Sequence, residues 1–299
     1  MSAGDAPQRF ITEPAYSFKP VTDEQACVYN NAQGFQISVQ TVLNNPNFAA
    51  NILNKMKSGV KKILQRLLGF DNYLFIFSLY IINTLKWNKK EGDFLHFLKL
   101  IPDGTTILDI GANIGIMTVW LARCKPASNI LAYEPMPQNI RALKRVISHY
   151  GFSNVTIIEK ALGNQNGEVE MVMPVLEDVK MQGLSHVVHE SITEFNEGKT
   201  VQVPILRLDE CPELQSGKHV VSAIKLDVEN FEYFVLKGGE NLIKKFKPLI
   251  YTELWENENR EHCFELMKEL GYSIQVLHQR QLVPFDKERH RVQNFFFVP

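Results

Sequence analysis

The chain has 299 residues, of which 45% are hydrophobic, so it can bury a large core but is short for two complete enzyme domains. Its formal net charge is −1, which excludes a global positive field that would attract nucleic acid or an anionic membrane. We therefore expect no nucleic-acid partner.

The N-terminal sequence and the cysteines indicate a cytoplasmic protein. The first residues, MSAGDAPQRF, lack the charged-then-apolar order of a secretory signal. The most apolar run, Tyr73 to Ile82, is about half of the roughly 20 residues that a transmembrane helix needs. No C-x-x-C pair occurs, so we expect reduced thiols and neither a zinc site nor a disulfide framework. The four cysteines are Cys27, Cys124, Cys211 and Cys263.

The N-terminal third is predicted to be a partly helical extension. Residues 1 to about 48 are polar and proline-containing, with a short strand expected at Gln36–Val42. Asn51–Leu68 then has apolar residues at helical spacing, five basic residues and no acidic one. Two further helices are expected at Tyr73–Trp87 and Glu91–Leu100.

The amphipathic helix at Asn51–Leu68 has two interpretations. Its apolar stripe can dock onto the rest of the chain or onto a second subunit, which makes a homodimer through the N-terminal helices possible. Alternatively, the helix can lie on an anionic membrane. We favour docking, because the chain is nearly neutral and stable membrane attachment usually takes two signals.

From Thr105 onward, short apolar runs alternate with helical stretches, which is typical of βαβ units with a parallel sheet. Strands are expected at Thr106–Ile110, Asn129–Tyr133, Val155–Glu159, Val221–Asp227 and Leu249–Leu254. Helices are expected at Ile114–Cys124, Pro137–His149, Phe231–Phe246 and Glu258–Leu270.

Two further strand pairs complete the predicted sheet architecture. A hairpin of Glu168–Met173 and Thr200–Ile205 is expected between the third and fourth main strands. Ser273–His278 and Gln293–Val298, joined by a charged loop, are expected to form an antiparallel edge. The prediction is a doubly wound α/β fold whose sheet is mostly parallel with an antiparallel C-terminal edge.

The segment TTILDIGANIGIMTVWLAR is the central motif. An apolar strand ends at Asp109, a glycine turn with Gly111, Asn113 and Gly115 follows, and a helix begins at once. Glycine permits a tight turn and close approach of a ligand, and the helix start presents free N–H groups. The pattern D-x-G-x-N-x-G differs from the dinucleotide pattern G-x-G-x-x-G, which argues against a nicotinamide-dependent oxidoreductase.

The ends of the next two strands add candidate binding residues. Glu134 ends the second strand, where an acidic residue can bind ribose hydroxyls, or can instead cap the helix near Pro137. Because Glu134 follows the glycine turn at the spacing of a nucleoside-binding site, we favour the ribose role over the capping role. The small residue Ala161, taken as the end of the third strand, leaves room for a flat adenine ring.

Carboxylates follow the fourth strand. Asp227 and Glu229 lie at its carboxyl end, where ligands bind in open α/β sheets, and Glu253 ends the next strand. Lys225 is a possible partner that would give these acids a structural role only. We favour a functional role for Asp227 and Glu229, because a further carboxylate, Glu253, lies near the end of the next strand.

The chain resembles the FkbM-type methyltransferase family from about Asp93 to the C-terminus. The matching segments, in order, are LDIGANIGIMTVWLA, YEPMPQNIRALKR, KALGNQNGEV, QGLSHV, VPILRLDE, IKLDVENFEYFVLKGGENLIKKFKPLIYTEL and LGY. The resemblance implies a Rossmann-like methyltransferase domain at residues 93–299 after an extension at residues 1–92. Where the family usually has glycine, this chain has Asn230, which tolerates the left-handed conformation better than most residues.

The resemblance implies S-adenosylmethionine as methyl donor, bound by Asp109, Gly111, Asn113, Gly115, Glu134 and Ala161. It implies a hydroxyl acceptor on a saccharide, glycolipid or natural product. Methyl transfer needs alignment, exclusion of water and a positioned base. Asp227 and Glu229 are the preferred candidates for the base, ahead of His186 and His189.

Two alternatives remain open. Asp227, Glu229 and Glu253 supply oxygen ligands of the kind that Mg²⁺ prefers, but we favour hydrogen bonding to the acceptor without metal. A catalytically silent member that binds the nucleoside as a scaffold is the other alternative, since binding does not prove turnover.

Overall fold

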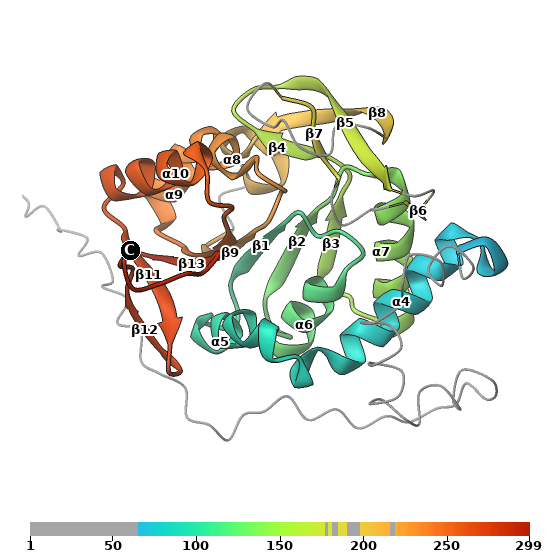
Figure 1. Ribbon diagram of the computed structural model, residues 1–299, viewed down its shortest axis with the longest axis horizontal. Coiled ribbons are helices and arrows are strands. Elements are labelled where there is room, and N and C mark those ends of the chain that lie inside the picture. The colour runs from blue at the N-terminus through green and yellow to red at the C-terminus, as the bar shows by residue number, and fades with distance from the viewer. Residues whose placement is uncertain (1–64, 177–178, 181–184, 190–197, 216–218) are drawn as a thin grey trace, which may run out of the picture.

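The computed structural model describes residues 65–176, 179–180, 185–189, 198–215 and 219–299 (Figure 1). The strand expected at Gln36–Val42 lies outside these residues. So does most of the amphipathic helix expected at Asn51–Leu68, of which residues 65–68 are helical.

The main sheet has eight strands in the order β12-β11-β13-β10-β9-β1-β2-β3. These strands are β1 (Thr106–Ile110), β2 (Asn129–Tyr133), β3 (Val155–Ile158), β9 (Val221–Leu226), β10 (Leu249–Glu253), β11 (Ser273–His278), β12 (Gln281–Pro284) and β13 (Asn294–Val298). The described α-helices are α4 (Phe70–Thr84), α5 (Gly92–Leu100), α6 (Ile116–Cys124), α7 (Pro137–Tyr150), α8 (Glu232–Gly238), α9 (Glu240–Phe246) and α10 (Glu258–Glu269).

The five strands β3, β2, β1, β9 and β10 run parallel and form the centre of the sheet. Every residue of β1 is buried, as expected for a parallel strand covered on both faces. Leu108 and Ile110 pack on the side of α8 and α10, whereas Ile107 packs on the side of α5 and α6. The predicted doubly wound α/β fold is therefore confirmed.

The helices that precede the sheet share its core. Ile82 of α4 and Phe94 of α5 are fully buried in the same hydrophobic cluster as Ile107 of β1. Indole Nε1 of Trp120 on α6 donates a 3.1 Å hydrogen bond to the carbonyl of Ile82. Helix α4 lies along α6 and α7 (Figure 1). The division at residues 92 and 93 stays a prediction.

A second sheet has the order β4-β8-β5-β6, with β7 paired to β5. Its strands are β4 (Ala161–Gly163), β5 (Gly167–Leu176), β6 (Val179–Lys180), β7 (His186–Val187) and β8 (Gly198–Arg207). The antiparallel pairing of β5 and β8 confirms the predicted hairpin. Ala161 was predicted to end the third strand, and this is wrong: β3 ends at Ile158, and Ala161 begins β4 of the second sheet.

The antiparallel edge is confirmed, because β13 runs antiparallel to both β10 and β11. The charged loop expected after His278 contains a further strand, β12, paired with β11. The two turn residues, Gln279 and Arg280, have positive φ angles of 49° and 67°. Such tight hairpin turns usually contain Asn-Gly or Asp-Gly, so the sequence gives no hairpin signal here.

Two predicted helices begin or end differently from the expectation. The helix expected from Ile114 begins at Ile116, because Gly115 in front of it is left-handed with φ 87°. The helix expected over Phe231–Phe246 is divided at Gly239 into α8 and α9. A Cβ atom on Gly238 would lie 1.8 Å from the carbonyl oxygen of Gly163, so a glycine is needed where α8 crosses β4.

Cys211 and Cys263 are buried free thiols, but Cys124 is disulfide-bonded, so the expectation of four reduced thiols is wrong for Cys124. Within the described ranges, no helix combines the length and apolar composition required to cross a lipid bilayer.

Candidate active site

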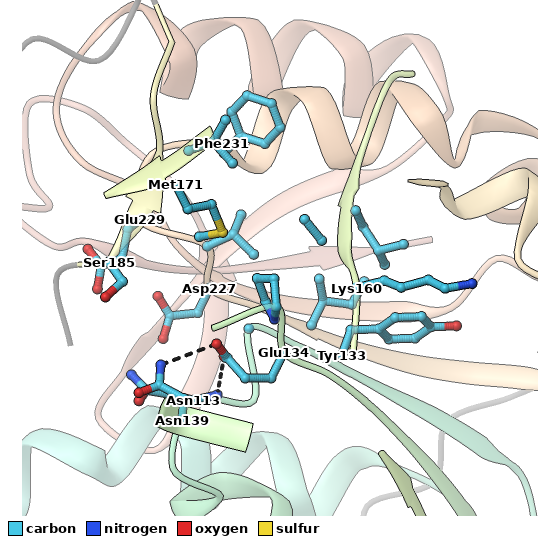
Figure 2. Close-up of a pocket in the computed structure, with 17 residues that line it drawn as sticks. Asn113, Tyr133, Glu134, Asn139, Lys160, Met171, Ser185, Asp227, Glu229 and Phe231 are labelled. Atoms are coloured by element: carbon cyan, nitrogen blue, oxygen red, sulfur yellow. Dashed lines mark hydrogen bonds between the residues drawn. The ribbon is translucent and has the colours of Figure 1, made fainter. Parts of the chain in front are cut away.

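A cleft lies at the carboxyl ends of β1, β2 and β9, between the main sheet and the second sheet (Figure 2). We call it the main cleft. It encloses about 580 Å³ of space, part of it open to solvent. Its predicted residues are Gly111, Asn113, Glu134, Ala161, Asp227 and Glu229. Asp109 and Gly115 were also predicted to bind the donor, but they do not line this cleft.

The glycine turn after β1 is shaped by contacts within the protein. Gly111 has φ 78°, and a Cβ atom there would lie 1.8 Å from the carbonyl oxygen of Asp227. At Gly115, with φ 87°, a Cβ atom would lie 2.6 Å from Leu143. Asn113 between them is left-handed, with φ 50°. Both glycines are therefore required by the backbone and its packing, and the turn brings Asn113 to the cleft.

Glu134 connects the glycine turn to the start of α7. Its Oε2 accepts a 2.8 Å hydrogen bond from the backbone N–H of Asn113. Its Oε1 accepts from the N–H of Met136 at 2.9 Å. The same oxygen accepts from Nδ2 of Asn139 at 3.2 Å (Figure 2). A carboxylate has about four acceptor positions, so one remains toward the cleft. Glu134 therefore fixes the start of α7 and lines the main cleft, and its binding of ribose hydroxyls stays a prediction.

Burial raises the pKa of Glu134 to about 7, against the hydrogen bonds from Met136 and Asn113, which lower it. The side chain is almost fully buried, with 4% exposed. Its charge therefore changes in the neutral pH range, and a hydrogen-bonding ligand that favours the carboxylate form would lower this pKa.

Lys225 of β9 connects the ends of β1 and β9 behind the main cleft. Its Nζ donates a 2.8 Å hydrogen bond to the carbonyl of Gly111. The same atom lies 3.4 Å from Oδ2 of Asp227 and 3.6 Å from Oδ1 of Asp109. Burial lowers the pKa of Lys225, but Asp227 and Asp109 outweigh burial and the net pKa is raised. The ammonium group therefore stays charged.

Asp109 is fully buried and points toward α6, where Thr118 donates a 2.6 Å hydrogen bond to its Oδ2. Its other oxygen faces Lys225. This carboxylate fixes Lys225 and α6 from inside the protein, and it has no surface in the main cleft.

Glu229 lies in a strained turn after β9. Its φ is 51°, a left-handed conformation that non-glycine residues rarely adopt. The turn is held by Glu232, whose Oε1 accepts from the N–H groups of Val228 at 3.0 Å and Asn230 at 3.2 Å. Burial, followed by the charges of Asp227 and Glu232, raises the pKa of Glu229 to about 9. Glu229 is therefore protonated at neutral pH and can donate a hydrogen bond.

Four residues that line the main cleft have a polar side-chain atom without a hydrogen-bond partner among the described residues. One is the hydroxyl of Tyr133, and the other three are Oδ1 of Asn113, Oδ1 of Asn139 and Oγ of Ser185. Buried polar atoms are normally paired, so these atoms are suited to a polar ligand. The amide oxygens accept hydrogen bonds, and each hydroxyl can donate or accept.

The two histidines considered as bases lie outside the lining of the main cleft. His186 is buried in β7, and the ring of His189 lies 4.5 Å from that of Phe234. Over the described residues, no group of three or more His, Cys, Asp or Glu side chains is arranged to hold a metal ion. The geometry therefore favours Asp227 and Glu229 over the histidines.

Comparison with known families decides the assignment. The model of the methyltransferase FkbM domain matches residues 109–274, which is more than half of the chain. The chain belongs to the FkbM methyltransferase family.

Several curated proteins are similar to this FkbM-family chain. Methyltransferase 1 of Beauveria bassiana is 31% identical over 154 residues, which cover 46% of this chain and 59% of that protein. The 2-O-methyltransferase NoeI of Sinorhizobium fredii is 28% identical over 166 residues, covering 52% of this chain and 65% of its own length. The chain thus spans less than two thirds of either relative.

Solved structures were compared as well. The crystal structure of methyltransferase FkbM from Methylobacillus flagellatus covers 87% of this chain and 60% of its own, with a TM-score of 0.45 and 14% identity. An S-adenosylmethionine-dependent O-methyltransferase from Thermotoga maritima covers 73% of this chain and 71% of its own, with a TM-score of 0.39 and 15% identity.

Asn230, the departure from the family pattern, keeps the turn and adds a side-chain hydrogen bond that glycine cannot make. Its φ is 75°, in the left-handed region as predicted. Its Oδ1 accepts a 2.6 Å hydrogen bond from Nδ2 of Asn257, the N-cap residue of α10. Its carbonyl accepts from Asn259 at 2.9 Å. The turn that carries Glu229 is therefore tied to the start of α10.

Sequence reasoning missed two residues of this site and one contact of a third. Lys225 was considered only as a partner of the acids, although it also fixes the Gly111 carbonyl. Asn139 and Ser185 were not singled out, although both reach the main cleft. Asn139 follows Glu134 in the matching segment YEPMPQNIRALKR, and Ser185 lies in QGLSHV, so the matching segments held the only signal for them.

Proposed function

We propose that this chain transfers a methyl group from S-adenosylmethionine to a hydroxyl group of a saccharide, glycolipid or natural-product acceptor. The observation that carries the proposal is the pairing of two sets of groups in the main cleft. Asn113, Glu134 and Ala161, the candidates for donor binding, line the same cleft as the carboxyl groups of Asp227 and Glu229. Family membership supports methyl transfer, and the relative named a 2-O-methyltransferase supports a hydroxyl acceptor.

The polar atoms of the main cleft fit the donor. Glu134 would accept a hydrogen bond from a ribose hydroxyl at its remaining acceptor position, and the unpartnered amide oxygens of Asn113 and Asn139 would accept from N–H or O–H groups of the same ligand. Ala161 and Leu162 provide an apolar surface for the adenine ring. When bound, S-adenosylmethionine supplies an electrophilic methyl carbon on its sulfonium group.

Asp227 and Glu229 would orient the acceptor and remove its proton. The protonated carboxyl of Glu229 donates a hydrogen bond to an acceptor oxygen, and the carboxylate of Asp227 accepts the hydroxyl proton as the oxygen attacks. Lys225 would position Asp227 and stabilise its charge before that step. The two acids then have different roles because their surroundings differ, as in other enzymes with paired carboxylates.

Calorimetric titration and a methyl-transfer assay test this proposal. S-adenosylmethionine should bind, and a radioactive methyl group should appear on hydroxyl compounds from a library of glycans, glycolipids and natural products. Binding of a nicotinamide dinucleotide in place of the donor would overturn it in favour of an oxidoreductase. Donor binding without transfer to any compound would favour the silent scaffold. A chelator should leave activity unchanged, and loss of activity that Mg²⁺ restores would favour the metal alternative.

A further inference from the structure

A second cleft lies between the start of α10 and the segment that joins β12 to β13. It encloses about 630 Å³, part of it open to solvent. Its charged and aromatic lining consists of Glu256, Arg260, Phe285, Lys287, His290 and Arg291. We call it the basic cleft, because three of these side chains are cationic and only one is acidic.

Arg260 is the buried element of the basic cleft. Its side chain is only 5% exposed, and its Nη2 lies 3.1 Å from Glu256, which is 63% exposed. Its Nε has no hydrogen-bond partner among the described residues, and its guanidinium lies 5.9 Å from the ring of Phe295. A buried guanidinium has five N–H donors to satisfy, and one exposed carboxylate does not satisfy them. An anion in the cleft would supply the missing acceptors.

The surrounding side chains add donors of different kinds. Nδ1 of His290 accepts a 3.0 Å hydrogen bond from the N–H of Asp286, so the neutral ring carries its proton on Nε2 as a donor. Lys287 is paired with Glu261 at 2.9 Å. Arg291 is exposed and has no ion pair with a described residue. Its guanidinium is therefore available to a ligand.

The start of α10 links the basic cleft to the turn after β9. Glu253 ends β10, and Glu256 follows three residues later, a span of at most roughly 10 Å. The N–H of Arg260 donates to Oδ1 of Asn257 at 3.2 Å, and Nδ2 of Asn257 donates to Asn230 in the turn beside Glu229. Asn257 therefore connects Arg260 of the basic cleft to the turn that carries Glu229 of the main cleft.

We propose that the basic cleft binds an anionic group of the methyl acceptor, a phosphate or a carboxylate, while the acceptor hydroxyl lies at Asp227 and Glu229. The inference rests on the proposed function, since it names the class of acceptor for the same site. Arg260 and Arg291 supply planar donors that match phosphate and carboxylate oxygens. The acceptor hydroxyl can hydrogen-bond to Asp227 and Glu229, whereas the carboxylate of Asp227 would repel an anionic group at that position.

The binding test uses the full chain and inorganic phosphate, titrated by calorimetry at constant ionic strength. The wild-type chain should show saturable binding at one site. Arg291→Gln should weaken this binding about three- to tenfold, because an exposed charge-assisted hydrogen bond is lost. The matched control is Arg289→Gln, whose guanidinium is 82% exposed, pairs with Asp286 and does not line the cleft. This control should bind phosphate as the wild type does.

No saturable binding to the wild type, or equal weakening in the two variants, would overturn the anion site. A kinetic arm uses the acceptor library as matched pairs, each neutral sugar glycoside beside its uronate or sugar phosphate. The anionic member should be the better acceptor, and Arg291→Gln should raise its KM without changing the KM of the neutral member. Preference for neutral acceptors would overturn the acceptor assignment. Phosphate binding with no methyl transfer at all would instead contradict the proposed function.

Discussion

The ammonium group of Lys225 lies 3.4 Å from a carboxylate oxygen of Asp227, although Lys225 itself does not line the main cleft. Its side chain is 3% exposed, whereas that of Asp227 is 35% exposed. A buried cation therefore fixes a carboxylate that a ligand can reach. The same cation contacts the Gly111 carbonyl and Asp109, so one side chain connects the end of β9 to the glycine turn after β1.

Lys225→Met should destabilise the fold by about 3 kcal/mol, because it leaves the buried Asp109 and the Gly111 carbonyl without their partner. Urea unfolding followed by circular dichroism measures the change. The control is Lys237→Met, since Lys237 is 47% exposed and pairs with Glu240 on the surface, where such pairs contribute about 0–1 kcal/mol. Equal losses in the two variants would show that the buried contacts of Lys225 with Asp109 and Gly111 do not stabilise the fold.

Glu134→Gln should weaken binding of S-adenosylmethionine about tenfold or more, because a charge-assisted hydrogen bond contributes about 1.5–3 kcal/mol. Calorimetric titration measures the affinity. Glu159→Gln, at an exposed carboxylate that follows β3, is the matched control and should bind as the wild type does. Unchanged affinity in Glu134→Gln would show that Glu134 serves only the glycine turn and the start of α7.

Asp227→Asn should lower kcat about a hundredfold or more, the size expected for loss of a general base, with donor affinity little changed. Steady-state kinetics and donor titration on the same preparation separate the two quantities. Glu265→Gln, on the exposed face of α10, serves as the control. A parallel loss of donor affinity and turnover would assign Asp227 to donor binding.

The free energy of unfolding should fall as pH rises from about 4.5 to about 9, because burial, Asp227 and Glu232 raise the pKa of Glu229 from 4.5 to about 9. In this range the folded state keeps a proton that the unfolded state releases, so stability is greatest at the acidic end. Glu229→Gln removes this titration. Its melting temperature should therefore rise relative to wild type between pH 5 and pH 9. A constant difference across that range would refute the raised pKa.

Leu74→Ala in α4 should destabilise the protein by about 2–5 kcal/mol, because Leu74 is fully buried against the neighbouring helices. Ile76→Ala on the same helix is the control, since Ile76 is 39% exposed. Thermal unfolding compares the two variants. Similar small effects would mean that α4 is loosely attached and does not belong to the structural core.

Local patterns predicted the central sheet well. The strand at Thr106–Ile110 and the strand at Asn129–Tyr133 have the expected bounds, because each is an apolar run closed by turn residues. The register between these strands also brings Asp109 opposite Ala132 and puts Glu134 next to the glycine turn. For this part of the fold, hydrophobic spacing and turn residues carry enough information.

Contacts between distant segments were harder to predict. Ala161 was predicted to end the third strand, yet it begins β4, which pairs with β8, more than forty residues later. The contacts of Lys225 with Gly111 and Asp109 join residues more than one hundred positions apart. Nothing in the local sequence of either segment specifies such a pairing, because it arises from the packing of strands side by side.

The position of β13 constrains the order in which the sheet can assemble. This strand follows β11 and β12 along the chain, yet it lies between β11 and β10. The β11–β12 hairpin can form early from local contacts, but it has no place on the sheet until β13 has paired with β10. Pairings of this non-local kind form slowly. Until then, β10 has one unpaired edge, which exposes a folding intermediate of this chain to strand pairing with another copy.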